Sequence, residues 1–106
     1  MDTLRQLKIA MNAFATGSEG ARDTAVEELS DLLEDASSMP PSDLQRVVAV
    51  LGGALAVEQS QNVVESILNA LVKAKYHAHL PIEQVRELRA TLSGSALEHA
   101  DYILED

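Results

Sequence analysis

Apolar residues recur at helical spacing along nearly all of the 106 residues. In the first segment they lie three or four positions apart, at Leu4, Leu7, Met11 and Phe14. Because an α-helix repeats every 3.6 residues, this spacing places them on one face of a helix. Gly17 follows and predicts the end of that helix. Similar segments follow to the end of the chain, and we predict six helices.

The later segments each have an apolar face of the same kind. The predicted inward positions are Ala21, Ala25, Leu29, Leu32 and Leu33; Leu44, Val47, Val48, Leu51 and Leu55; Val63, Val64, Ile67, Leu68 and Leu71; Val85, Leu88 and Leu92; Ala100, Ile103 and Leu104. Val and Ile are frequent around 47–50 and 63–67, which would suit strands, but apolar and polar residues do not alternate there. The fold class is therefore predicted to be all-α.

Residues with special backbone properties separate these segments. Ser18 is predicted to cap the second helix and Ser60 to lie near the start of the fourth. The Pro40-Pro41 pair ends one segment, and Pro81 suits the first turn of the fifth helix. Ser42–Gln45 and Ser95–Glu98 match the capping box, so we predict that each opens a helix. Gly52-Gly53 is predicted to let a neighbouring backbone approach the third helix.

The prolines and glycines that separate the helices recur at a regular interval, as the apolar positions do. A shift of 41 positions places Pro40 on Pro81 and Gly53 on Gly94, and it also superposes apolar positions of the third and fifth helices. We therefore predict one helical-repeat domain, residues 1–106, made of three stacked antiparallel hairpins near 2–36, 42–76 and 81–105. One hairpin cannot cover its own apolar face, so about three must stack before the core closes.

The second helix carries a family resemblance. Its segment Ala21–Leu32 resembles the second helix of a HEAT repeat, in which Val-Arg is followed by Ala and then by two Leu. Prolines 40 and 81 also lie near the starts of first helices, as HEAT repeats often have. The middle hairpin has Ser60 where Arg22 would align, and the last has Leu97. The resemblance implies a HEAT-like α-solenoid, and a compact six-helix bundle is the alternative.

Composition narrows the function classes. Seventeen acidic residues against eight basic ones give a net charge of −9, which disfavours direct binding to nucleic acid. The absence of cysteine excludes thiolate metal sites and a cysteine nucleophile. The longest nearly apolar run, Val47–Val57, is far shorter than the roughly 20 residues of a membrane span, and residues 1–5 show no secretion signal. We expect a cytoplasmic protein that does not bind a membrane.

The acidic residues cluster in the second helix. Asp23, Glu27, Asp31 and Asp35 lie four positions apart and form one ridge, with Glu34 beside it. Like charges at this spacing each cost roughly 0.2–0.5 kcal/mol in helix stability. These five residues are predicted to bind a basic partner protein; the alternative is a solvated face that keeps the protein soluble. A second acidic group ends the chain, at Glu98, Asp101, Glu105 and Asp106.

Candidate catalytic residues are sparse. His77 and His79 flank Ala78 before Pro81, and they would hold a metal only with a third ligand from elsewhere; the alternative is a pair that caps the fourth helix. His99 would act as an acid or base only in a pocket that shifts its pKa. The motifs of serine hydrolases, phosphate-binding loops and zinc proteases are absent from the sequence. We predict a protein that is not an enzyme, with no cofactor and no metal.

Three hypotheses of function remain. The first is a module that binds a basic protein, most concretely an immunity protein that occludes the active site of a cationic toxin. This is a similarity of type, because no motif here is diagnostic of that class. The second is a HEAT-type adaptor or assembly protein that binds through an apolar groove between hairpins. The third, a helical enzyme subunit or metal protein, rests on His77 and His79.

Overall fold

The computed structural model of this protein describes residues 3–105. Helices account for most of this part of the chain, and it contains no strand. The elements are α1 (Thr3–Thr16), α2 (Glu19–Leu33), η1 (Ala36–Ser38), α3 (Pro41–Val57), α4 (Gln61–Ala74), α5 (Ile82–Leu88), η2 (Arg89–Thr91) and α6 (Gly94–Leu104). The prediction of an all-α fold with six helices is confirmed. Asp2, where the first predicted hairpin begins, and Asp106 of the second acidic group lie outside the described residues.

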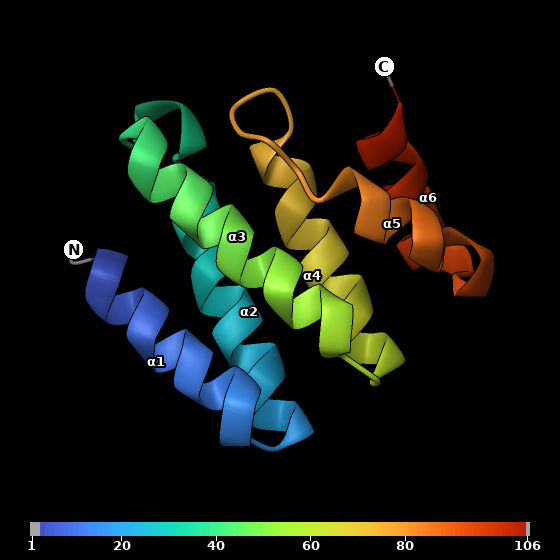
Figure 1. Cartoon of the computed structure of the whole chain (residues 1–106), viewed down its shortest axis with the longest axis horizontal. Coiled ribbons are helices and arrows are strands. Elements are labelled where there is room, and N and C mark those ends of the chain that lie inside the picture. The colour runs from blue at the N-terminus through green and yellow to red at the C-terminus, as the bar shows by residue number, and fades with distance from the viewer. Residues whose placement is uncertain (1–2, 106) are drawn as a thin grey trace.

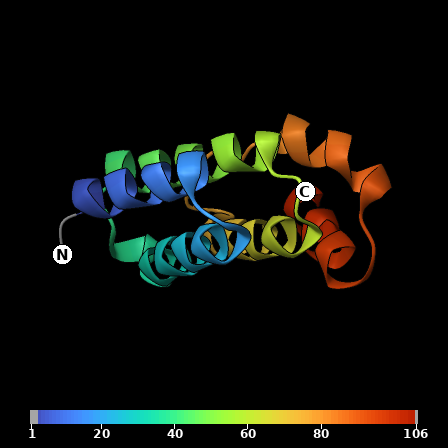
Figure 2. The same cartoon turned by 90° about the horizontal axis from the view of Figure 1, so that it is seen from below.

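The helices form two layers (Figures 1 and 2). Each hairpin contributes its first helix to one layer, which we call the odd layer (α1, α3, α5), and its second to the other, the even layer (α2, α4, α6). The molecule measures 36 × 32 × 18 Å, and its shortest dimension matches two helices of about 10 Å each. The even helices pack against one another more extensively than the odd helices do. The prediction of stacked antiparallel hairpins therefore describes the arrangement.

The core lies between the two layers, and the central hairpin supplies much of it. All five predicted apolar positions of α3 and all five of α4 are buried. From the neighbouring helices, Val26, Leu29 and Leu33 of α2 and Ala100 and Ile103 of α6 complete it. The sequence pattern is most reliable in α3 and α4 because both have neighbours on two sides in their own layer.

The first helix departs from the predicted pattern. Leu7 is buried, but Leu4 and Met11 remain 51% and 55% exposed. Since α1 lies at the edge of the odd layer, it has a neighbour in that layer only on the α3 side. Its apolar face is wider than the surface that α2 and α3 cover, which leaves part of it at the molecular surface.

The helix starts agree with the sequence analysis in two cases and differ in two. Ser18 accepts a hydrogen bond from the Ala21 amide at 3.2 Å, and Ser60 accepts one from the Val63 amide at 3.4 Å. The predicted capping boxes are wrong. The helix α3 already begins at Pro41, and α6 begins at Gly94, and neither has a side-chain cap.

The two adjacent glycines of α3 lie in different surroundings. A Cβ atom on Gly52 would lie 3.3 Å from the Cβ atom of Pro81, where the start of α5 packs on α3. A Cβ atom on Gly53 would meet nothing within 4 Å. The group that approaches α3 at Gly52 is thus a side chain and not the predicted backbone, and Gly53 faces open space. Along residues 3–105, none of the helices combines the length and apolar character required to cross a bilayer.

Candidate functional site

The outer side of α2 carries the exposed carboxylates. Burial of Val26, Leu29 and Leu33 fixes the rotation of the helix, so Glu27 and Asp31 point away from the core. Asp35 follows one turn later and is also exposed. In the described part of the chain, none of these three carboxylates takes part in an ion pair. The structure therefore leaves three of the five predicted binding residues available to a partner.

The other two predicted residues contact α4. Asp23 is half-buried and accepts a hydrogen bond of 2.6 Å from the Ser66 hydroxyl. Glu34 is exposed and forms an ion pair with Lys73. Both therefore contribute to the packing of α2 against α4, and the structure does not bring all five residues to one uniform ridge.

A hollow of about 590 Å³ lies between α1 and α2 on the same side as Asp31 and Asp35. Its lining combines carboxylates with apolar and neutral polar side chains, from Thr3, Gln6, Ile9, Glu28, Asp31, Leu32, Asp35 and Met39. Glu28 also lines this hollow, although the sequence favoured the five other carboxylates over it as contacts. A stripe with steps of three and four, 28–31–35, would have included it.

A second surface depression lies in the odd layer, between α1 and α3. It has a volume of about 420 Å³ and an almost entirely apolar lining: Met11, Phe14, Ala15, Ala49, Val50, Gly53, Ala54 and Val57. We call it the α1–α3 channel. Met11 and Phe14, which the helical spacing predicts to face inward, thus border a channel that the sequence does not predict.

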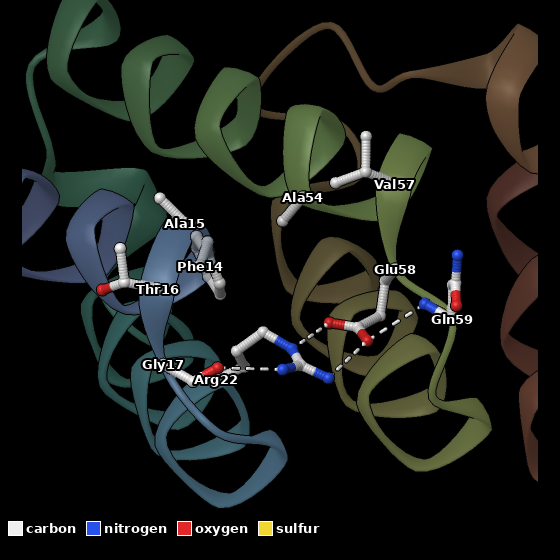
Figure 3. Close-up of a pocket in the computed structure, with 9 residues that line it drawn as sticks. All are labelled: Phe14, Ala15, Thr16, Gly17, Arg22, Ala54, Val57, Glu58 and Gln59. Atoms are coloured by element: carbon white, nitrogen blue, oxygen red, sulfur yellow. Dashed lines mark hydrogen bonds and ion pairs between the residues drawn. The ribbon is translucent and has the colours of Figure 1, made fainter.

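Ionisable side chains meet in a third depression, between the turns of the first two hairpins (Figure 3). The Arg22 Nε donates to Glu58 Oε1 at 2.8 Å and the Arg22 Nη2 to Glu58 Oε2 at 3.1 Å. The remaining Arg22 Nη1 donates to the Gly17 carbonyl at 3.0 Å, and Glu58 Oε2 also accepts the Gln59 and Ser60 amides. Three of the five N–H donors of Arg22 and both carboxylate oxygens of Glu58 are therefore engaged within the protein.

The pKa of Glu58 reflects two opposing effects. Burial raises the pKa, since only 4% of the side chain is exposed. The hydrogen bonds from Arg22 and from the Ser60 and Gln59 amides stabilise the carboxylate and lower the pKa by more than burial raises it. The net result is a pKa below the ordinary value of 4.5. The hydrogen bond to Glu58 also raises the pKa of Arg22. This pair therefore stays ionised at neutral pH and ties α2 to the end of α3, and it is poorly suited to proton transfer.

The histidines line none of these three depressions. His77 and His79 are exposed on the segment between α4 and α5, and the His79 backbone exchanges two hydrogen bonds of 3.0 Å with the side chain of Gln45. His99 is half-buried in α6. Nowhere in residues 3–105 do three or more His, Asp or Glu side chains converge as a metal site would require.

Two tyrosines flank a buried lysine where α4 and α6 end. The Lys75 ammonium donates to the Tyr102 carbonyl and lies 4.3 Å from the centre of the Tyr102 ring. It lies 5.3 Å from the ring of Tyr76, which is 77% exposed and has a φ of 76°. Lys75 thus neutralises part of the negative C-terminal end of α6, and it joins the second and third hairpins.

Comparisons with known proteins identify no relative. No protein-family model matches the chain, and neither a curated protein nor a solved structure resembles it significantly.

Proposed function

We propose that this protein is a non-catalytic binding module that docks a basic partner protein on the outer side of α2. The observation that carries the proposal is the exposure of Glu27, Asp31 and Asp35 on one side, without an intramolecular ion pair in residues 3–105. Carboxylates at this spacing repel one another in the free protein, and a cationic partner would relieve that repulsion.

The hollow between α1 and α2 supports a basic side chain as the anchor of this interface. Ile9, Leu32 and Met39 offer apolar surface, while Asp31 and Asp35 line the same hollow. Lysine and arginine combine an aliphatic stem with a charged end, so such a side chain would contact both kinds of group at once. Arginine is the better candidate because its planar guanidinium bonds two carboxylate oxygens in parallel.

The most concrete form of this function is that of an immunity protein. A small, acidic scaffold of stacked hairpins, similar in type to HEAT repeats, would cover the active site of a cationic toxin and block its substrate. The net charge of −9 would accelerate capture of such a partner through long-range attraction. We place this encounter in the cytoplasm, where a producing cell needs protection from its own toxin.

Affinity purification from the native host, followed by mass spectrometry, tests this function. The wild-type chain should retain a basic protein that elutes as the salt concentration rises, because salt screens exposed charges. The triple variant Glu27→Lys, Asp31→Lys and Asp35→Lys should retain much less of it, while circular dichroism shows an unchanged helix content.

A matched variant separates the location of the charges from their number. Glu65, Glu87 and Glu98 are exposed on α4, α5 and α6, and their replacement by lysine changes the net charge by the same amount. This control should retain the partner substantially better than the α2 variant. Equal retention by both variants, or a partner that is acidic and insensitive to salt, would contradict the proposal.

The second candidate function is that of an adaptor that binds through an apolar groove between hairpins. The α1–α3 channel favours it, because its lining is apolar and Met11 and Val57 at its edges are 55% and 73% exposed. Binding there would depend on apolar contact and would respond much less to salt than binding to α2. The two candidates use opposite layers of the molecule, so one chain has the surfaces for both.

A further inference from the structure

The α1–α3 channel runs along two helices that present matching stripes. Successive hairpins place their first helices, α1 and α3, side by side in the same direction (Figure 1). Met11 and Ala15 line the channel from α1, and Val50, Gly53 and Val57 line it from α3. These positions are separated by three or four residues, so each helix contributes one continuous edge of the channel.

The α1–α3 channel is open to solvent at Gly53 and along its edges. A Cβ atom on Gly53 would have no heavy atom within 4 Å, whereas its neighbour Gly52 lies against Pro81. Met11 and Val57, on the two edges, expose more than half of their surface. Apolar surface of this kind gains free energy when it is covered, at about 25 cal/mol for each Å² removed from water.

Cations continue both stripes at one end of the channel. Lys8 precedes Met11 by three positions and Ala15 by seven, and Arg46 precedes Val50 by four and Gly53 by seven. Both side chains are exposed, and neither forms an ion pair within the part of the chain that is described. The helix α1 contains no acidic residue, so Lys8 has no opposite charge on its own helix.

We propose that the α1–α3 channel binds an amphipathic helix of a partner protein, with its aliphatic residues against Met11, Val50 and Val57 and its carboxylates beside Lys8 and Arg46. This inference rests on the second candidate function and names the chemistry of its ligand. A helix fits because apolar ridges of three- and four-residue spacing pack into the groove between two parallel helices. About three turns would span the stripes.

A second copy of this chain does not meet these requirements. Each copy carries a net charge of −9, so two copies repel each other. The acidic helices α2 and α6 have their aliphatic residues Val26, Leu29, Leu33 and Ile103 buried in the core. Outside the core these two helices have only the partly exposed Leu32, Leu97 and Leu104, so neither presents aliphatic residues at every third or fourth position to the channel of another copy.

A synthetic peptide tests the channel directly. The probe is a fluorescein-labelled, helix-forming peptide of about 14 residues, with leucine at every third or fourth position and glutamates in its first turn, where they also stabilise its helix. Fluorescence anisotropy should show at least about tenfold tighter binding than for the same peptide with lysines in place of the glutamates. On peptide binding, the amide resonances of α1 and α3 should shift in the ¹⁵N spectrum, and those of α2 and α6 should keep their positions.

Two variants at one position separate filling of the channel from damage to the fold. Gly53→Leu should lower the affinity for the glutamate peptide by at least about tenfold, because its side chain occupies the channel, whereas Gly53→Ala should leave the affinity nearly unchanged. Both replace a helical glycine with a better helix former, so both should fold. If Gly53→Leu does not fold, the double variant Lys8→Glu and Arg46→Glu tests the inference in its place. This double variant should bind the lysine peptide more tightly than the glutamate peptide, the reverse of the wild-type preference.

Several results would overturn the inference. These are absence of binding by the glutamate peptide, equal affinity for the two peptides, an unchanged affinity in folded Gly53→Leu, an unreversed preference in the double variant, or resonance shifts outside α1 and α3. The α2 triple variant (Glu27, Asp31 and Asp35 to lysine) should bind the glutamate peptide in the same channel, with the same α1 and α3 resonances shifted. The channel can therefore fail while the acidic face succeeds, and the reverse also holds.

Discussion

At the scale of single residues, Glu58 shows how one side chain joins two hairpins. It lies directly after α3, receives two hydrogen bonds from Arg22 of α2 and also accepts the Ser60 amide at the start of α4. With 4% of its side chain exposed, it leaves little room for water to replace these contacts. Its removal would therefore leave several donors without a partner, which costs more than the loss of an exposed ion pair.

Glu58→Gln should lower the free energy of unfolding by about 1–3 kcal/mol at neutral pH, because the charged hydrogen bonds from Arg22 are lost. The pKa of Glu58 is below 4.5 in the folded protein, so its contribution is present above that pH and is lost as the pH falls through the folded pKa. The difference between wild type and variant should shrink as the pH falls below about 4.5 and through the folded pKa.

Urea unfolding of both proteins across this pH range measures the difference, and the subtraction removes the common effect of the other carboxylates. Glu65→Gln is the matched control, because Glu65 is exposed on α4, and this change should alter stability by no more than about 0.5 kcal/mol. A constant difference between wild type and Glu58→Gln over the whole range would show that the Arg22 contact does not depend on the charge of Glu58.

At the scale of elements, the predicted N-cap of α2 is correct and the predicted capping box of α3 is wrong. Ser18 and Ser42 both precede apolar helical segments, but only Ser18 caps a helix. The helix α3 begins at Pro41, so Ser42 lies inside its first turn. The Gln45 side chain, which the capping box would have used, instead binds the backbone of His79 across 34 positions. The Gln45 side chain thus forms a tertiary contact instead of the local hydrogen bond of a capping box.

Ser18→Ala should lower the free energy of unfolding by about 1 kcal/mol, because the Ala21 amide loses its partner. Ser42→Ala should change it by no more than about 0.5 kcal/mol, since Ser42 is exposed and no cap depends on it. Thermal or chemical unfolding of the two variants provides the comparison. Equal losses in both would indicate that the capping box at Ser42 forms in solution.

At the scale of the whole molecule, the two layers differ in charge. The even helix α2 contains Glu19, Asp23, Glu27, Glu28 and Asp31 against the single cation Arg22, while α1 of the odd layer contains Arg5 and Lys8 and no acidic residue. Both binding proposals depend on this separation, because a basic partner would approach the even layer and an acidic helix the odd layer (Figure 2). The net charge of −9 alone predicts only the first.

The repulsion on α2 should be visible in the stability of the free protein. The melting temperature of the wild type should rise as salt increases from about 0.01 to 0.5 M, because the screening length falls from about 30 Å to a few Å. The neutral triple variant Glu27→Gln, Asp31→Asn and Asp35→Asn should melt higher at low salt and respond less to added salt, since each i,i+4 repulsion that it removes costs about 0.2–0.5 kcal/mol.

Differential scanning calorimetry of both proteins measures these melting temperatures, and the variant with glutamine at Glu65, Glu87 and Glu98 serves as the control of equal charge. That control should gain less at low salt, because its substitutions lie on three different helices. A wild type whose melting temperature is independent of salt would show that the carboxylates of α2 are not under strain, and the main argument for a basic partner would then be lost.

The sequence alone determined the helices and most of the core. Helical periodicity and turn residues act over a few positions, so Gly17, Ser18, Ser60 and the prolines could be interpreted without knowledge of the fold. The same applies to the buried faces of α3 and α4, which have neighbours on both sides in their layer. The rough location of the acidic surface followed as well, because charges four positions apart must share one side of a helix.

The tertiary structure decided which of these side chains remain available. Asp23 and Asp31 belong to the same predicted ridge, yet Asp23 is bonded to Ser66 of α4 and Asp31 is exposed. Met11 belongs to the same apolar pattern as Leu7, yet only Leu7 is buried. The periodicity of one helix indicates its faces but contains no information on which neighbour covers each face. That depends on how the hairpins stack, through contacts between residues far apart in the chain.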